Sequence, residues 1–335
     1  MQANKHIFYV HSNITLLLSL AACRQINTED VIFLLGRKYT IPHNYINCTY
    51  TTIALNDYIA YLEKTPTTGS YATVRNLKGL TEIDKLLYGL GKFECYLPSV
   101  NNFLFQAIAT NRNCATYNII EEGLLTFQAP KMYLKNNLCI KSSLINVLKK
   151  TLLYPKHLNR SGVYNLNVAK FGHTYVISKD ILTINPEAIL VSIDGIETNL
   201  TSDTINHLFI LDNLDMPEVN KDEYFRIIKA ISSEINGLIY IKSHPANHAK
   251  YAEEINSWGN KYKLLPETFP LEIYFNTKPQ TKVYGFVSSL LIYAANANLE
   301  VECLLTKLSI ESPLRVWAKR IMPTYFFKKL GITDL

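Results

Sequence analysis

Residues 114–123, Cys114-Ala115-Thr116-Tyr117-Asn118-Ile119-Ile120-Glu121-Glu122-Gly123, end an apolar run with two carboxylates and a glycine. Much of this run is β-branched or aromatic, which predicts a buried strand that stops at the glutamates. Two later stretches have the same form, because strand-like residues 237–241 precede Lys242-Ser243-His244-Pro245 and residues 282–287 precede Ser288-Ser289. Ligands of open α/β sheets bind beyond the carboxyl ends of the strands, so all three polar segments are candidates for one site.

Strand and helix patterns alternate through the first part of the chain. We predict strands at residues 6–12, 30–35, 93–98 and 115–120, and helices at 13–24, 54–64, 82–90 and 101–111. Helices of about ten residues between strands are typical of βαβ units, which build a parallel sheet.

A second alternating series follows a less regular stretch at residues 127–206, in which we expect one helix near 143–153. It predicts strands at 207–212, 237–241, 283–287 and 301–306, and helices at 221–234, 249–258, 271–275 and 289–297. The expected fold class is α/β, with two Rossmann-like domains facing a cleft, which is the GT-B glycosyltransferase architecture. We expect the domains at 1–155 and 156–311, and a C-terminal helix or tail at 312–335 that packs back across them.

Composition narrows the class of protein. A chain of 335 residues is long enough for two domains, and 48% hydrophobic against 19% charged residues excludes a disordered chain. The net charge of +6 favours anionic partners such as nucleotides or acidic glycans. No Lys/Arg run resembles a nucleic-acid-binding arm, so we expect no nucleic-acid partner. Six scattered cysteines without a C-x-x-C pair favour a reducing, cytoplasmic compartment.

The N-terminal region contains a misleading pattern. Residues 14–23 end in Leu20-Ala21-Ala22-Cys23, which looks like a lipoprotein cleavage site behind a short apolar segment. Only one lysine precedes it, and the strand-like flank at 6–10 favours the first strand and helix of an α/β domain instead. No other stretch approaches 18 consecutive apolar residues, so we expect no membrane span.

Each polar segment has two interpretations, one as part of a reactive site and one as an ordinary structural element. A carboxylate from Glu121 or Glu122 can act as a general base, although a solvated acidic turn is common, and adjacent strand-end residues point to opposite faces. Lys242 and His244 alternate onto one face, where an imidazolium can protonate a leaving phosphate; the alternative is a histidine in a turn before Pro245.

The remaining candidates lie at helix starts. Ser288 and Ser289 precede a predicted helix, where hydroxyls and free N–H groups bind anions or simply cap the helix. Glu272 can bind a ribose diol or merely favour the helix dipole. The sequence has no G-x-G-x-x-G, no P-loop, no Asp-x-Asp pair and no histidines at metal-ligand spacing, so we expect no metal.

Together these residues resemble the bacterial sialyltransferases that share a D/E-D/E-G motif, an H-P motif and a paired-serine motif. That group includes lipooligosaccharide sialyltransferases and capsular polysialyltransferases. The motifs stand here as Glu121-Glu122-Gly123, His244-Pro245 and Ser288-Ser289, and the resemblance covers residues 119–289.

The resemblance implies an inverting, metal-independent transferase that uses CMP-sialic acid as co-substrate and no cofactor. By the same resemblance, Glu122 deprotonates the acceptor hydroxyl and His244 stabilises the departing CMP phosphate. The implied donor-binding residues are Lys242, Pro245, Glu272, Ser288 and Ser289. Several relatives carry an aspartate where this chain has Glu-Glu, so the choice of base between Glu121 and Glu122 stays open.

The implied partners are a CMP-sugar donor and a glycan acceptor of the lipooligosaccharide or capsule type. We expect the acceptor on the N-terminal side, near His11, Ser12 and Asn13 at the end of the first strand. Basic and aromatic residues in the C-terminal tail suggest peripheral contact with the inner face of the bacterial inner membrane. The alternatives are a transferase for another CMP-nonulosonic acid (pseudaminic or legionaminic type), a sugar-nucleotide epimerase, or a non-catalytic glycan-binding protein.

Overall fold

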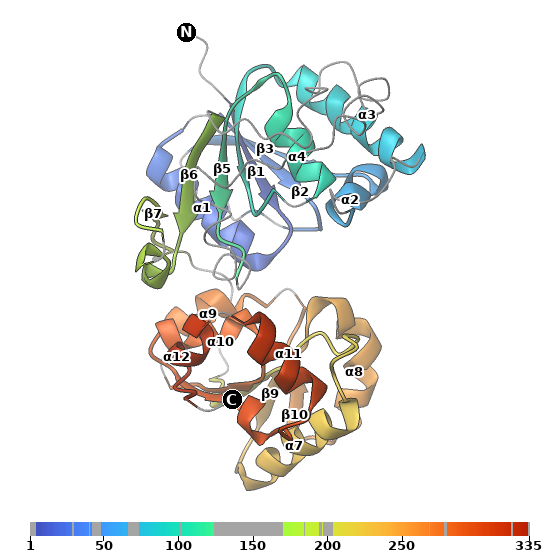
Figure 1. Ribbon diagram of the computed structural model, residues 1–335, viewed down its shortest axis with the longest axis vertical. Helices are drawn as coiled ribbons and strands as arrows, with labels where there is room; N and C mark the ends of the chain where they lie inside the picture. The colour runs from blue at the N-terminus through green and yellow to red at the C-terminus, as the bar shows by residue number, and fades with distance from the viewer. Residues whose placement is uncertain are drawn as a thin grey trace. The chain divides into compact units, whose positions relative to one another are not determined.

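The computed structural model describes residues 5–28, 30–39, 41, 48–65, 74–100, 102–123, 170–183, 185–193, 196, 204–267, 269–277, 280–322 and 324–333. The chain divides into two compact units, each built on its own sheet (Figure 1). Unit 1 comprises Met1–Glu122 and Ala129–Ile196, and unit 2 comprises Gly123–Gln128 and Glu197–Leu335.

Unit 1 contains a seven-stranded parallel sheet with the order β3-β2-β1-β4-β5-β6-β7. Its strands are β1 Lys5–Val10, β2 Asp30–Leu35, β3 Thr49–Ala54, β4 Phe93–Leu97, β5 Cys114–Ile120, β6 Phe171–Val176 and β7 Ile189–Leu190. Its described helices are α1 Asn13–Ile26, α2 Asp57–Glu63, α3 Val74–Gly89, α4 Phe103–Thr110 and the 3₁₀ helix η5 Lys179–Thr183.

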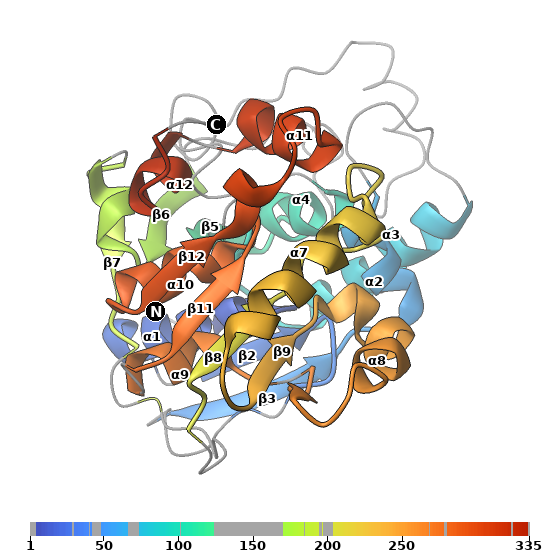
Figure 2. The ribbon, with the colours of Figure 1, turned by 90° about the horizontal axis from the view of Figure 1, so that it is seen from below.

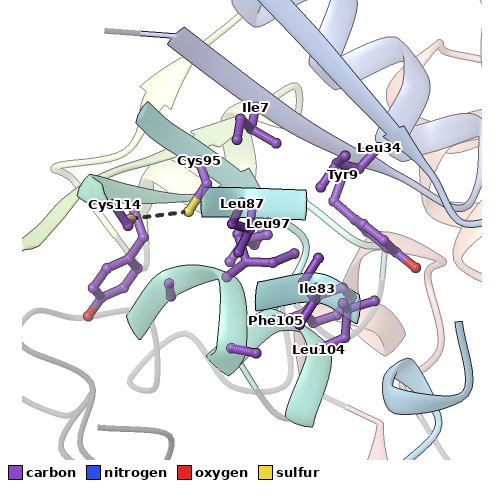
Figure 3. Close-up of a cluster of buried hydrophobic side chains, with 14 of the residues drawn as sticks. Ile7, Tyr9, Leu34, Ile83, Leu87, Cys95, Leu97, Leu104, Phe105 and Cys114 are labelled. Atoms are coloured by element: carbon purple, nitrogen blue, oxygen red, sulfur yellow. Dashed lines mark hydrogen bonds between the residues drawn. The ribbon is translucent and has the colours of Figure 1, made fainter. Parts of the chain in front are cut away.

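Alternate residues of the unit 1 strands build its main core. Ile7 and Tyr9 of β1 and Cys95 and Leu97 of β4 point to one face, since side chains alternate along a strand. There they pack with apolar residues of α3 and α4, among them Leu87 and Phe105 (Figure 3). Burial of this continuous apolar layer fixes which face of the sheet each helix covers.

Unit 2 contains a five-stranded parallel sheet with the order β10-β9-β8-β11-β12. Its strands are β8 His207–Ile210, β9 Ile239–Lys242, β10 Tyr262–Leu264, β11 Lys282–Gly285 and β12 Glu300–Cys303. Its helices are α7 Lys221–Glu234, η6 Pro245–Asn247, α8 His248–Asn256, α9 Leu271–Thr277, α10 Ser289–Asn296, η7 Leu304–Lys307, α11 Pro313–Ile321 and α12 Thr324–Lys329.

Helices cover both faces of the unit 2 sheet. Tyr224 of α7 stacks on Phe286, with ring centroids 4.1 Å apart, so α7 covers the face to which Phe286 points (Figure 2). Gly285 points to the opposite face, where a β-carbon would lie 3.1 Å from Leu291 of α10. α11 and α12 pack within the same unit, on η7 and α10 respectively.

Both sheets reverse their strand order at an equivalent place. Unit 1 turns from β1 to β4 and unit 2 from β8 to β11, and each has a strand added on the other side of its first strand. In open α/β sheets, ligands bind at the carboxyl ends of the strands beside such a switch point. The residues after β1 and β4, and those after β8 and β11, are therefore the ones to search for chemistry.

Several features differ from the sequence-based expectations. β3 precedes α2 in a region where we expected only a helix at 54–64, because its Thr-rich residues gave no apolar strand pattern. β6 pairs with β5 and β7 pairs with β6, so both strands belong to unit 1, whereas we expected the second domain to begin at 156. The predicted helix near 143–153 lies outside the described residues.

The α/β class and the parallel sheets are confirmed, and most strands lie within a few residues of their expected positions. The run before Cys23 forms the buried helix α1 next to β1. Among the described helices, none combines the length and apolar character needed to cross a membrane.

Candidate active site

The two adjacent glutamates after β5 occupy different environments. Glu121 is completely buried, and its Oε2 accepts hydrogen bonds from the backbone N–H groups of Ile177 at 2.9 Å and Ser178 at 3.3 Å. These donors follow β6, so Glu121 fastens the end of β6 to the end of β5. Its carboxyl group therefore has a structural role, since it is buried and hydrogen-bonded to the backbone.

Glu122 keeps part of its side chain exposed, at 21%. Its Oε1 lies 2.8 Å from Nε2 of His11, which directly follows β1. Gly123 comes next with φ of 55°, a left-handed conformation that glycine adopts without strain. The chain thus turns sharply after Glu122 and leaves its carboxylate at the strand ends, paired with an imidazole.

His11 is held in place from several sides. Its backbone N–H donates to Thr15 Oγ1 at 3.1 Å, and its ring lies 5.6 Å from that of Tyr9 and 6.4 Å from that of Phe105. Within the described part of the chain, the buried Nδ1 has no hydrogen-bond partner. The contact to Glu122 is therefore the polar anchor of this ring, and a donating Nε2–H fixes where the carboxylate points.

The other two expected acceptor-side residues have structural roles. Ser12 caps α1: its Oγ accepts from the backbone N–H of Thr15 at 3.3 Å, and its own N–H donates to Thr15 Oγ1 at 3.0 Å. Asn13 is the first residue of α1. The structure thus brings His11 to Glu122.

A second carboxylate near the unit 1 switch point was not expected from the sequence. The phenol of Tyr9, on β1, donates to Oε2 of Glu63, at the end of α2. Burial and the negative charge of Glu63 raise the pKa of Tyr9 far above its usual value, so the phenol keeps its proton. The sequence separates the two by more than fifty residues and gave no reason to pair them.

In unit 2, Lys242 ends β9 with a buried side chain. Its Nζ donates to the carbonyl oxygens of Pro266 at 2.7 Å and Glu267 at 2.6 Å. Burial lowers the pKa of Lys242 to about 8, against the opposing charges of Glu272 and Glu267. The lysine therefore stabilises the segment that leads into α9, and its predicted contact with a cytosine stays a prediction.

The residues after Lys242 pass from buried to exposed. Ser243 is buried, with its Oγ 2.8 Å from Nδ1 of His248, whereas His244 and Pro245 are exposed. The carbonyl oxygen of His244 accepts from the N–H of Asn247, which closes the turn into η6. This turn presents the imidazole of His244 to solvent next to the end of β9.

Ser288 and Ser289 follow β11 at the switch point of unit 2. Ser288 is the N-cap of α10, and its Oγ accepts from the N–H of Leu290 at 3.3 Å. Both serines are partly exposed, so the hydroxyl hydrogen of Ser288 remains available to donate to an anion. The N-terminus of α10 adds a favourable dipole for negative charge at this place.

Glu272 lies in the first turn of α9. Burial raises the pKa of its carboxyl, and the nearby charge of Lys242 partly offsets that rise. Lys242 and Glu272 thus lie close enough for their charges to interact, and their expected donor-binding roles stay predictions.

Asp212, two residues beyond β8, was missed as a site residue. It is buried, and its Oδ1 accepts the N–H of Val287 at 3.3 Å while its Oδ2 accepts the phenol hydrogen of Tyr224 at 3.0 Å. Burial raises its pKa to about 7 despite these hydrogen bonds. Its position in the sequence could have identified it as a site residue, because an aspartate at the end of the first strand of a Rossmann-like unit lies at the switch point.

A family model and solved structures place the chain among known proteins. Residues 7–298 match the family model described as Alpha-2,8-polysialyltransferase (POLYST). The search of curated proteins found no significant match.

Solved structures resemble the fold over nearly the whole chain. A sialyltransferase GT-B domain from Photobacterium damselae superimposes with a TM-score of 0.52 at 13% identity, covering 98% of this chain and 97% of that one. The S. aureus MnaA–UDP complex gives a TM-score of 0.51 at 10% identity, covering 98% and 91% of the two chains. The Methanocaldococcus jannaschii UDP-GlcNAc 2-epimerase gives 0.51 at 11%, covering 99% and 93%. At such low identity these likenesses establish the GT-B fold alone.

Proposed function

The chain belongs to the alpha-2,8-polysialyltransferase family, and we propose that this sialyltransferase moves sialic acid from CMP-sialic acid to a hydroxyl of a bacterial surface glycan, with inversion and without a metal ion. The observation that carries the proposal is the pairing of His11 Nε2 with Glu122 Oε1 at 2.8 Å. The adjacent Glu121 is buried instead and accepts hydrogen bonds from backbone N–H groups. The pairing with His11 supports Glu122, rather than Glu121, as the proposed base.

In the proposed reaction, Glu122 accepts the proton of the acceptor hydroxyl as that oxygen attacks the anomeric carbon of the donor sugar. The bond between this carbon and the phosphate oxygen breaks, and its electron pair leaves with CMP. A carboxylate held by a histidine N–H is oriented before the acceptor arrives, so little freedom is lost at the transition state.

Unit 2 supplies the proposed donor contacts. His244 gives a proton or hydrogen bond to the departing phosphate, and the hydroxyls of Ser288 and Ser289 bind its oxygens. Glu272 binds the ribose, Lys242 lies close to the cytidine and Pro245 packs on the base. CMP leaves as a monophosphate, so these groups can offset its charge; among the described residues no cluster of metal-ligand type is present.

The decisive experiment follows CMP release from CMP-sialic acid with and without defined sialoside acceptors. We expect release to depend on acceptor in the wild type, and to fall by about 10³-fold or more in Glu122→Gln and in His244→Ala. Asp215→Asn is a matched control, because this exposed aspartate pairs with Lys250 at 2.6 Å and has no proposed role in the reaction.

A wild-type enzyme that neither transfers nor hydrolyses CMP-sialic acid would contradict the donor assignment. The same assay with CMP-pseudaminic and CMP-legionaminic acid then identifies the alternative nonulosonic donor. Full activity in Glu122→Gln would remove the proposed base, whatever the donor.

We also propose that α11 and α12 contact an anionic membrane surface on the cytoplasmic side. The basic residues Arg315, Lys319, Arg320, Lys328 and Lys329 lie on these two short helices. Val316 is 55% exposed and Ile310 is 79% exposed, so apolar side chains accompany the charge. Basic residues near anionic lipid contribute roughly 1 kcal/mol each.

Co-sedimentation with vesicles of phosphatidylglycerol and phosphatidylethanolamine tests this contact. We expect Lys319→Glu/Arg320→Glu to weaken binding by tenfold or more, on the order of 1 kcal/mol per removed charge. The matched control Lys85→Glu/Lys92→Glu places the same reversal on exposed lysines of unit 1. Equal loss in both variants, or binding to neutral vesicles, would contradict a role for α11.

A further inference from the structure

Asp212 connects the two strand ends at the switch point of unit 2. It follows β8, and its Oδ1 accepts the N–H of Val287, the residue immediately before Ser288. The carboxylate therefore fixes the backbone of the turn that presents Ser288 and Ser289 at the start of α10. Since this hydrogen bond joins the turn to a buried carboxyl, the state of that carboxyl affects how the serines are presented.

Among the residues that the structure describes, no cation is found to act on the Asp212 carboxyl. In the described part of the chain, the groups that act on its carboxyl are the phenol of Tyr224, on α7, and the N–H groups of Val287 and Asp212 itself. The thiol of Cys303, on β12, also faces this charge, and its pKa is raised to about 12, chiefly by burial. Neither Tyr224 nor Cys303 supplies positive charge, so a carboxylate here stays uncompensated.

An anion bound by the serines would place a second negative charge one residue away from the Asp212 contact. Two like charges in a partly desolvated place repel, and the repulsion disappears when the carboxyl takes a proton. The hydrogen bond from Val287 survives protonation, because the carbonyl oxygen of a neutral carboxyl still accepts it. The turn therefore keeps its geometry while losing the charge.

We propose that Asp212 positions the Ser288–Ser289 turn and takes up a proton from solvent when an anionic phosphate binds there, so that donor affinity in this enzyme is coupled to pH. The proposal rests on the proposed assignment of the donor phosphate to these serines. It is a positioning role, since Asp212 acts through Val287 and touches no substrate in it.

The test is calorimetric titration of the full-length enzyme with the methyl ester of cytidine 5′-monophosphate between pH 5.5 and 8.5. This phosphodiester carries one negative charge over the whole range, so the ligand itself does not titrate. The quantity of interest is the ratio of the wild-type Kd to that of Asp212→Asn. We expect a ratio near 1 at pH 5.5 that rises to about 10 at pH 8.5, since one pKa unit corresponds to tenfold.

Two further variants separate the proton coupling from a general loss of structure. Tyr224→Phe removes a hydrogen bond that lowers the pKa of Asp212, so the decline in affinity should move to higher pH, which a merely structural defect would not cause. Asp215→Asn is the matched control three residues along the same loop, and its ratio to wild type should stay constant with pH.

The possible failures are distinguishable. Absence of binding in the wild type at every pH overturns the donor assignment and this coupling together. Binding in the wild type with a pH-independent ratio for Asp212→Asn, or an unmoved midpoint in Tyr224→Phe, overturns the coupling alone and leaves the proposed function standing.

Discussion

In unit 1 the strand-end acid Glu122, which follows β5, is partly open to solvent and paired with His11, whereas in unit 2 the strand-end acid Asp212, which follows β8, is buried and accepts a hydrogen bond from Tyr224. Around them the two units are built alike. Phe8 of β1 stacks on Tyr96 of β4 with ring centroids 4.1 Å apart and planes at 11°. Phe209 of β8 stacks on Tyr284 of β11 at 4.6 Å and 10°.

The likeness extends to a histidine two residues before each phenylalanine. Nδ1 of His6 lies 3.0 Å from the hydroxyl of Tyr96, and Nδ1 of His207 lies 3.3 Å from that of Tyr284. Both phenylalanine–tyrosine pairs are direct register partners between the two central strands. The two units thus share the same aromatic strand pair, while their strand-end acids Glu122 and Asp212 lie in different surroundings.

The largest effect should come from substituting the two adjacent glutamates, Glu121 and Glu122, one at a time. Glu122→Gln should lower kcat by about 10³-fold with little change in stability, because it removes a proton acceptor from a partly exposed position. Glu121→Gln should instead lower the free energy of unfolding by about 2–3 kcal/mol, since it alters a buried carboxyl that accepts hydrogen bonds from two N–H groups. Kinetics and chemical denaturation measure the two effects.

A stable but inactive Glu121→Gln, together with an active Glu122→Gln, would reverse the assignment of the base.

The second effect concerns stability against pH in unit 2. Burial raises the pKa of Asp212 to about 7 in the folded protein from an ordinary value near 4, so the native state binds more protons between these values. Stability from this group is present at low pH and is lost as pH rises from about 4 to 7. The wild type loses this contribution between pH 4 and pH 8, whereas Asp212→Asn does not. The free energy of unfolding of Asp212→Asn, relative to that of the wild type, should therefore rise by about 2–4 kcal/mol from pH 4 to pH 8.

Urea denaturation at both pH values measures this double difference. An identical pH dependence in both proteins would show that Asp212 ionises as freely in the folded state as in the unfolded one.

The third effect tests what His11 does for Glu122. His11→Phe keeps the ring volume but removes the N–H donor, and should lower kcat by about 10- to 100-fold with a smaller change in the donor KM. His11→Gln restores a donor and should recover part of the loss. Equal activity in the two variants would leave the 2.8 Å contact without a catalytic consequence.

The smallest effect compares the two aromatic pairs. Tyr96→Phe and Tyr284→Phe each keep the stacked ring and remove one hydroxyl contact to a histidine, so each should cost about 0.5–1.5 kcal/mol of unfolding free energy. The shorter contact in unit 1 predicts the larger cost there. A larger loss from Tyr284→Phe would show that the two strand pairs are supported differently.

Much of the fold could be predicted because local patterns carried it. The strand at 30–35 coincides with β2, and the capping residue Ser288 marks the start of α10, as its sequence suggested. β3 was missed because exposed threonines replace the apolar run of a buried strand. β7 has only two residues and β6 follows a long stretch without a clear pattern, so the pairing of β6 with β5 and of β7 with β6 had no local indication.

The sequence by itself determined the α/β class, the three polar strand ends and the sialyltransferase resemblance, because periodicity and short motifs are local properties of the chain. Only the tertiary structure decided that Glu121 is consumed by the N–H groups after β6, that Glu122 pairs with His11, and that Lys242 is tied to the segment before α9. Each of these contacts joins residues that are far apart in the chain. Which polar groups become buried, and which hydrogen-bond partners they find there, depends on which strands lie side by side.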